Sequence, residues 1–338
     1  MDLKNNSREE SQKWYTSNKM NFTICANEIS NLIEKILNQK GIIFHSITSR
    51  VKEENSFLEK CNKEKYINPV SEIKDVVGIR IITHTSIEVK QVCEVIKNEF
   101  NIDGNNSVNK ADRLDEDKVG YLSVHYVASL NENRKNLPEY NSIKKLCFEI
   151  QVRTLLQHTW AEIEHDKSYK FSGELRKDLK RRFYLVAGVL ELMDHEFEKL
   201  SYEIENYALE VKDKTEYGDY DIDIDSTSLE EYMKSKYGDL GERAGNHIKG
   251  DMIEELKKFG INTLRDIENI SKGKSLRIED NSYYGILRDL MIITDADKYF
   301  KEAYDHSWSF MEMDSLKEYE VYNIDISSYL EAFNIDII

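Results

Sequence analysis

Two stretches of this chain alternate between apolar and polar residues, a pattern typical of a β-strand with two different faces. They are GYLSVHYVASL at 120–130 and LCFEIQVRT at 146–154. The apolar positions are Leu122, Val124, Tyr126 and Ala128 in the first and Leu146, Phe148, Ile150 and Val152 in the second. The opposite face carries Tyr121, Ser123 and His125 on the first strand, and Glu149, Gln151 and Arg153 with Cys147 on the second. These strands therefore predict a sheet with one face in a core and one polar face.

Helical segments flank and separate the predicted strands. Residues 20–40 show helical spacing of apolar residues, and residues 76–84 (VVGIRIITH) form a short apolar run typical of a buried strand, followed by a helical segment at 86–100. Strands alternating with helices predict an α/β (α+β) fold, a mixed sheet flanked by helices. Helices normally cover both faces of such a sheet, so a polar row on a covered face is better explained as a functional site than as surface. Residues 101–119 are polar and irregular, and they predict a long loop.

Apolar residues recur at steps of four and three between residues 179 and 211. The positions are Leu179, Phe183, Val186, Leu190, Met193, Phe197, Leu200, Ile204, Tyr207 and Val211. This heptad pattern predicts one long helix. Two interpretations stay open: a helix that packs on its own domain, or a helix that pairs with another subunit of a homo-oligomer.

Composition divides the chain near residue 216. Residues 219–338 carry 27 acidic and 14 basic side chains, which is −13 of the total charge of −16. We expect a first domain at 1–215 and a smaller, acidic, mostly helical domain at 216–338, for which a regulatory role is one interpretation. Within the second domain we expect a linker or exposed strand before a capping box of Ser228 with Glu231, and strand-like pieces in KEYEVYNIDISSYL at 317–330.

Several classes of protein are excluded by simple counts. The N-terminus lacks an apolar signal region, and no run approaches 18 apolar residues, so we expect a soluble cytoplasmic protein without a membrane partner. The four cysteines form no CxxC pair, which argues against disulfides and a cysteine zinc site. The spacing of His158, Glu162 and His165 is not a zinc signature. A strongly acidic chain is also a poor match for duplex DNA.

Two acidic residues and a basic segment suggest phosphate chemistry. Asp75 precedes the strand at 76–84 and Glu149 lies in the strand at 146–154; if their carboxylates converge, Mg²⁺ is the natural counter-ion. Read alone, Asp75 could instead cap the strand. Arg50, Lys52, Ser56 and Lys60 are spaced to cradle a polyphosphate. Read alone, this stretch is also compatible with a solvated run of charges.

Four motifs, in this order, resemble the synthetase domain of the RelA/SpoT family of alarmone synthetases. They are RVKEENSFLEK, DVVGIR, GYLSVHYV and FEIQVRTLLQHTWAEIEHDKSYK, and the resemblance extends over residues 14–210. It implies a nucleotidyltransferase-like fold and transfer of pyrophosphate from ATP to the 3′-hydroxyl of GDP or GTP, with release of AMP. It also implies synthesis without hydrolysis, as in the small single-domain members, whose helices after the last motif help to build oligomers.

The resemblance further implies roles for individual residues. Asp75 and Glu149 match the family's Mg²⁺ carboxylates, and Glu149 is placed to accept the proton of the attacking hydroxyl. The implied ATP contacts are Arg50, Lys52, Ser56, Lys60 and Arg80. The implied contacts of the acceptor nucleotide are Tyr121, which would stack on guanine, with Ser123, His125, Gln151, Arg153, His158 and Lys118.

One motif departs from the family pattern. Family members often carry a lysine four residues before the stacking tyrosine, whereas Lys118 stands three before it here, so Lys110 or Arg113 are alternatives for the acceptor phosphates. Two other functions are therefore compared with the alarmone synthetase: a toxic relative, restrained by its C-terminal domain, that modifies adenosine nucleotides or the 3′ end of tRNA, and an inactive nucleotide-binding regulator.

Overall fold

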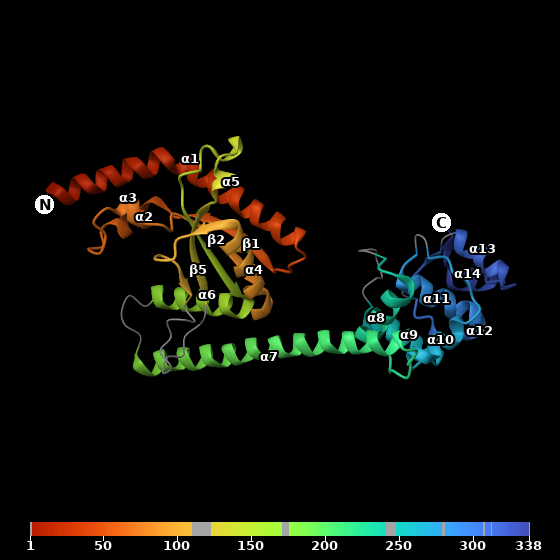
Figure 1. The fold of residues 1–338 in the computed structure, drawn as a ribbon. Helices are drawn as coiled ribbons and strands as arrows, with labels where there is room; N and C mark the ends of the chain where they lie inside the picture. The colour runs from red at the N-terminus through yellow and green to blue at the C-terminus, as the bar shows by residue number, and fades with distance from the viewer. Residues whose placement is uncertain are drawn as a thin grey trace. The chain divides into compact units, whose positions relative to one another are not determined.

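A computed structural model describes residues 2–109, 123–170, 176–240, 248–278, 281–306, 308–311 and 313–337. The chain divides into two compact units, Met1–Lys199 and Leu200–Ile338, and each is described by itself. Figure 1 labels their helices and strands. No helix in these ranges is long and apolar enough to span a membrane.

Unit 1 is built on a mixed sheet. Its strands are β1 (Ser46–Val51), β2 (Val77–Thr83), β3 (Phe100–Ile102), β4 (Val108–Asn109), β5 (Val124–Leu130) and β6 (Phe148–Thr154). Their order is β1-β2-β6-β5-β3, and β4 also pairs with β5. The β2–β6 pair is parallel and the other pairs are antiparallel. The predicted mixed sheet flanked by helices is confirmed.

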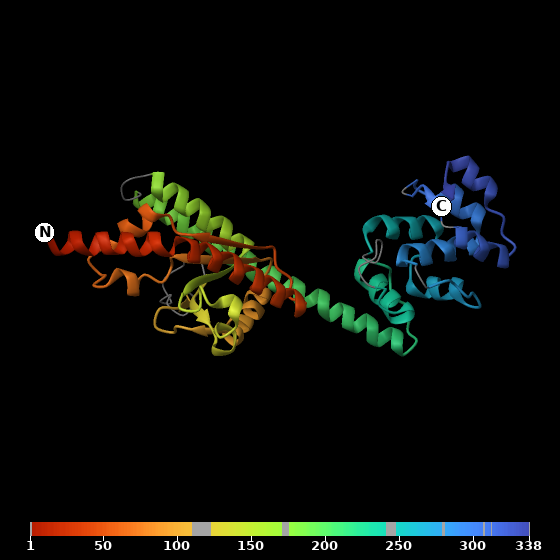
Figure 2. The same cartoon turned by 90° about the horizontal axis from the view of Figure 1, so that it is seen from above.

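Helices cover the apolar face of this sheet. The helices of unit 1 are α1 (Asp2–Gln39), α2 (Glu54–Cys61), α3 (Pro69–Glu72), α4 (Ser86–Glu99), α5 (Glu132–Lys135), the short 3₁₀ helix Pro138–Tyr140, α6 (Leu155–Lys170) and the first part of α7 (Lys177–Glu216). Figures 1 and 2 show α1 lying across the sheet. Ile29 of α1, Val92 of α4 and Ile150 of β6 are each fully buried in one shared cluster. This burial fixes the strand faces, because a one-residue slip would expose every core side chain.

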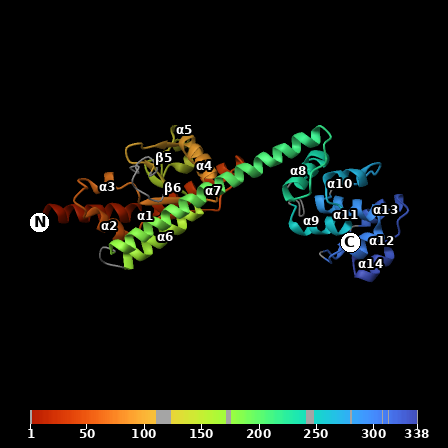
Figure 3. The same cartoon turned by 90° about the horizontal axis from the view of Figure 1, so that it is seen from below.

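The 40-residue helix α7 confirms the predicted long helix. Figure 3 shows α6 lying alongside its first part. The first part of α7 is held to the rest of unit 1 by polar contacts. Buried Asp194 accepts a 2.8 Å hydrogen bond from Thr154 Oγ1, and Glu198 accepts 2.6 Å bonds from Ser86 Oγ and Lys90 Nζ. Half of the heptad positions predicted between Leu179 and Val211 are exposed rather than buried. These exposed positions are Val186, Met193, Phe197, Leu200 and Ile204.

Unit 2 is mostly helical. Its elements are the end of α7, then α8 (Ser226–Tyr237), α9 (Gly250–Phe259), α10 (Leu264–Ser271), α11 (Tyr283–Thr294), α12 (Ala296–Lys298), a π-helical turn (Tyr299–Ala303), β7 (Phe310–Met311), α13 (Met313–Val321), α14 (Ser327–Phe333) and β8 (Asp336–Ile337). The centre of its core is α11, where Ile286, Leu290 and Met291 are fully buried.

Two expectations for unit 2 are wrong. The cap of α8 is Asp225 with Ser228, three residues earlier than the predicted pair, because the Asp225 side chain accepts from the backbone of Thr227 and Ser228. The tyrosine-rich segment at 317–330 is helical rather than strand-like. Tyr319 and Leu330 lie on the buried faces of α13 and α14, and this burial outweighs the local preference of aromatic and β-branched residues for strands.

Candidate active site

The polar face of the sheet brings together residues that are about a hundred positions apart in the sequence. Strand register places Arg50 opposite Gly78, and Gly78 opposite Glu149. The next row runs through Arg80 and Gln151 to His125. Residues paired across neighbouring strands point to the same face. Arg50 and Arg80, predicted on the donor side, therefore share one face with Glu149, Gln151 and His125.

Glu149 is held at both carboxylate oxygens. His125 Nδ1 lies 3.0 Å from Oε1, and Gln151 Nε2 donates to Oε2 at 2.8 Å. Burial alone would raise the pKa of Glu149, but the interactions with His125 and Gln151 outweigh it and hold the pKa below its usual value. The negative charge of Asp75 acts in the opposite direction on this pKa. The two acids therefore interact electrostatically, as a shared cation site requires.

Asp75 has one oxygen engaged and one available. Its Oδ2 lies 2.6 Å from Lys60 Nζ and 3.0 Å from Lys52 Nζ. Burial raises the pKa of Asp75, but hydrogen bonds from the two lysines more than offset it, so the net shift is downward. Its Oδ1 is buried and has no hydrogen-bond partner among the described residues. Because a buried carboxylate oxygen without a partner is unfavourable, this atom is suited to bind a ligand.

The two carboxylates fit Mg²⁺ better than a cation held by protein ligands alone. No group of three or more His, Cys, Asp or Glu side chains is arranged for a metal within the described ranges. Mg²⁺ commonly binds one or two carboxylates together with substrate phosphates and water. Asp75 and Glu149 fit such a site, in which the nucleotide supplies the remaining ligands.

The donor-side cations line the neighbouring strands. Arg50 lies over Gly78, where an added Cβ would meet its Cγ at 3.7 Å. Arg80 forms a 3.1 Å ion pair with Glu162 of α6. Ser56 is exposed on α2, one turn before Lys60. The Tyr15 hydroxyl of α1 donates a 2.6 Å bond to the backbone oxygen of Lys52 and so supports this segment.

Arg153 and His158, two of the predicted acceptor contacts, lie close enough to Arg80 for its charge to act on both. Arg153 is buried, and its Nη2 donates to Gln151 Oε1. Burial, followed by the charge of Arg80, lowers the pKa of Arg153 to about 10. Burial and the charges of Arg80 and Arg153 also lower the pKa of His158, whose Nδ1 lacks a hydrogen-bond partner among the described residues. Arg80 and Arg153 are two neighbouring cations that repel one another, and such a pair attracts an anion.

Some predicted contacts lie outside the described residues, namely Tyr121, Lys118, Lys110 and Arg113. Ser123 is described, and its Oγ lies 2.8 Å from His125 Nε2. Sequence reasoning missed the pairing of Glu162 with Arg80, since it considered Glu162 only as a metal ligand. It also missed Tyr15, because no local pattern connects α1 with Lys52.

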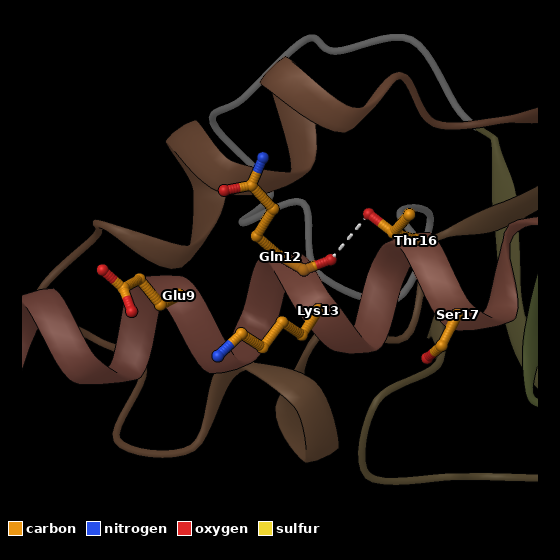
Figure 4. A pocket seen from close by; sticks show the side chains of 5 residues that line it. All are labelled: Glu9, Gln12, Lys13, Thr16 and Ser17. Atoms are coloured by element: carbon orange, nitrogen blue, oxygen red, sulfur yellow. Dashed lines mark hydrogen bonds between the residues drawn. The ribbon is translucent and has the colours of Figure 1, made fainter.

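An open groove of about 620 Å³ runs along α1, and its described lining is Glu9, Gln12, Lys13, Thr16 and Ser17 (Figure 4). Gln12 Nε2 donates a 2.8 Å bond to Glu54 Oε1 of α2. Within the described part of the chain, this lining contains none of the predicted nucleotide contacts.

Comparison with known proteins identifies the segment that carries this site. Residues 49–174 match a family model described as a region found in RelA / SpoT proteins. The GTP pyrophosphokinase YjbM of Bacillus subtilis (strain 168) is 28% identical over 163 residues, covering 47% of this chain and 72% of that protein. The GTP pyrophosphokinase YwaC of the same organism is 27% identical over 162 residues, covering 46% and 73%.

A crystal structure of the small alarmone synthetase 1 from Bacillus subtilis has a TM-score of 0.49 and 24% identity, covering 57% of this chain and 98% of that one. The matched segment, residues 49–174, contains every predicted site residue from Arg50 to His158. The resemblance seen in the motifs is thus confirmed: residues 49–174 match the region found in RelA / SpoT proteins.

Proposed function

We propose that this protein transfers pyrophosphate from ATP to the 3′-hydroxyl of GDP or GTP and releases AMP. Two observations support the proposal: Arg50, Arg80 and Arg153 share a sheet face with Glu149, and Asp75, an acid with one available oxygen, binds Lys52 and Lys60. The two Bacillus subtilis relatives named GTP pyrophosphokinase support the same reaction.

The chemistry of phosphoryl-type transfer explains why this set of residues suffices. Such reactions depend on positioning and on stabilisation of developing charge more than on covalent catalysis. Arg50, Lys52, Lys60 and Arg80 would bind the donor ATP, with Ser56 at its edge. Asp75 and Glu149 would hold Mg²⁺, which, when bound, neutralises phosphate charge. Glu149 would accept the proton of the acceptor hydroxyl.

We propose that Gln151, Arg153 and His158 would contact the acceptor nucleotide. Tyr121 is proposed to stack on its base. For the phosphates of the acceptor we propose Lys118, with Lys110 and Arg113 as alternatives.

The C-terminal segment has a separate proposed role. We propose residues 1–215 as the catalytic part and residues 216–338 as a regulator of its activity. Unit 2 supports a role of its own because it has a hydrophobic core of its own and most of the chain's net negative charge.

The test is product analysis with the full chain. ATP labelled at the γ-phosphate is offered with GDP, GTP, ADP or deacylated tRNA in the presence of Mg²⁺. The proposal predicts label in a guanosine tetra- or pentaphosphate with stoichiometric AMP. Label in adenosine products or in tRNA would instead support the toxic relative, and unlabelled acceptors despite tight ATP binding would indicate an inactive regulator.

A further inference from the structure

A continuous line of hydrogen bonds passes through Glu149 along the polar face. Ser123 Oγ lies 2.8 Å from His125 Nε2, and His125 Nδ1 lies 3.0 Å from Glu149 Oε1. On the other side, Gln151 Nε2 donates to Glu149 Oε2 at 2.8 Å, and Arg153 Nη2 donates to Gln151 Oε1. The line crosses the β5–β6 pair, where His125 is directly opposite Gln151.

Both ring nitrogens of His125 are engaged within the protein. An imidazole bonded at both nitrogens is fixed in its ring orientation, and the group at one nitrogen determines which tautomer meets the other. The side chains of Ser123, His125 and Glu149 are each partly buried, so they border the site rather than lie in the core. Neither ring nitrogen of His125 is therefore available to form a hydrogen bond with a nucleotide.

Glu149 and Asp75 differ in the same respect. One oxygen of Glu149 is hydrogen-bonded to His125 and the other to Gln151. Asp75 Oδ1, in contrast, has no hydrogen-bond partner among the described residues. A base that removes a proton has to be held within a few tenths of an ångström of its productive position.

We propose that Ser123 and His125 are positioning residues for Glu149 and do not contact the acceptor nucleotide. Ser123 fixes the ring of His125, and His125 fixes the carboxylate that receives the proton. This inference rests on the proposed function. In the step it serves, the acceptor oxygen forms a bond to the β-phosphorus of ATP while its O–H bond breaks and the proton moves to Glu149. The bond between the β-phosphorus and the α-phosphate oxygen breaks, and AMP leaves with that electron pair.

Steady-state kinetics of Ser123→Ala test this role, with Ser129→Ala as the matched control. Ser129 lies on the same strand and the same face, opposite Asn101, and it is not a member of the hydrogen-bonded line through Glu149. Loss of one orienting hydrogen bond predicts a fall in kcat of about fivefold to tenfold, with the KM for the acceptor unchanged within about twofold. A raised acceptor KM with unchanged kcat would overturn the proposal, as would equal behaviour of the two alanine variants.

Two substitutions of His125 separate its two nitrogens. Asparagine places an amide near the position of Nδ1, and glutamine places one near Nε2. His125→Asn should retain more kcat than His125→Gln, because only the former preserves the contact with Glu149. The reverse order would overturn the proposal.

Metal binding gives a readout independent of turnover. Mn²⁺ affinity in the presence of a non-hydrolysable ATP analogue, measured by electron paramagnetic resonance, should be unchanged within about twofold in Ser123→Ala and reduced by more than about tenfold in Asp75→Asn. Weakened Mn²⁺ binding in Ser123→Ala would contradict a positioning role confined to the base. If the wild-type protein modifies no acceptor, the proposed function fails, and this failure is distinct from a wild-type enzyme whose Ser123→Ala variant is unaffected.

Discussion

Lys52 and Lys60 bind the same oxygen of Asp75, at 3.0 and 2.6 Å. Both lysines are proposed ATP contacts, so the carboxylate that would hold Mg²⁺ also holds the lysines that would hold the phosphates. A triphosphate carries several negative charges and competes for the lysines with a single carboxylate. Donor binding is therefore expected to rearrange these contacts, which joins ATP binding to preparation of the metal site.

Lys60→Met tests the donor role at the scale of one residue. Loss of a charge-assisted contact of about 1.5–3 kcal/mol predicts an affinity for a non-hydrolysable ATP analogue that is weaker by about tenfold to a hundredfold. Isothermal titration calorimetry measures this affinity. Lys63→Met is the control, because Lys63 is exposed just beyond the end of α2. Equal affinities of the two variants would contradict a phosphate contact by Lys60.

A second residue-scale prediction concerns Asp289, which is buried in unit 2. Burial raises its pKa from the ordinary value of 3.8 to about 6, despite hydrogen bonds from Tyr319 and Asn281. Because the folded state binds this proton more tightly than the unfolded chain, the contribution of Asp289 to stability is greatest below about pH 4. It is lost as the pH rises to about 6, with a total effect of roughly 3 kcal/mol.

Asp289→Asn should therefore flatten the pH dependence of the free energy of unfolding between pH 4 and 7. Urea unfolding followed by Trp308 fluorescence, in a chain with Trp14 and Trp160 replaced by Phe, measures it. The control is Asp336→Asn at an exposed position of β8. An Asp289→Asn chain with the same pH dependence as its parent would show that Asp289 has no raised pKa.

Sequence alone predicts which residues of the site face share a side of a strand, but it does not predict their contacts. Alternation places Glu149, Gln151 and Arg153 on one face because the period of a strand is two. The contact of His125 with Glu149 depends on the β5–β6 register, which is set by burial of distant apolar residues such as Tyr126 and Ile150. The contact of Lys52 with Asp75 depends in the same way on β1 pairing with β2.

At the scale of elements, α7 shows how periodicity predicts a helix but not its partner. The heptad steps correctly predict a helix over 179–211, yet unit 1 is joined to it by Asp194 and Glu198, which are not in the seam. In the part of this stripe that belongs to unit 1, Val186 and Met193 are 51% and 45% exposed. Such a stripe is typical of a protein interface.

We propose that a second copy of the chain covers this stripe. Val186→Glu combined with Met193→Glu should shift the protein to a smaller species, since burying two carboxylates in an apolar interface is strongly unfavourable. Light scattering coupled to size exclusion measures the mass. The control is Glu203→Lys, an exposed charge change on the same helix. A wild-type protein that is already monomeric at micromolar concentration would contradict this interface.

The whole molecule combines a site that attracts anions with a chain of net charge −16. Most of the net negative charge lies in residues 219–338, and unit 2 has its own core around α11. The residues assigned to the polar face all belong to unit 1, and regulation is the role proposed for unit 2.

A chain ending at Gly218 tests this regulation. If unit 2 restrains the enzyme, the truncated chain should be more active by about fivefold or more, which is the range expected for coupling between distinct sites. Initial rates of AMP release are compared with those of the full chain, after circular dichroism has shown that the helices of the truncated chain are retained. Equal specific activities of the two folded proteins would contradict a restraining role.

The central claim is that Glu149 accepts a proton during pyrophosphate transfer on this sheet face. Single-turnover transfer of label from γ-labelled ATP to GDP, by the wild-type protein and by Glu149→Gln, tests it most directly. We predict a rate lower by about 10²–10⁴-fold in the variant, with affinity for the ATP analogue unchanged within about threefold. A Glu149→Gln variant that transfers label at close to the wild-type rate would contradict the account.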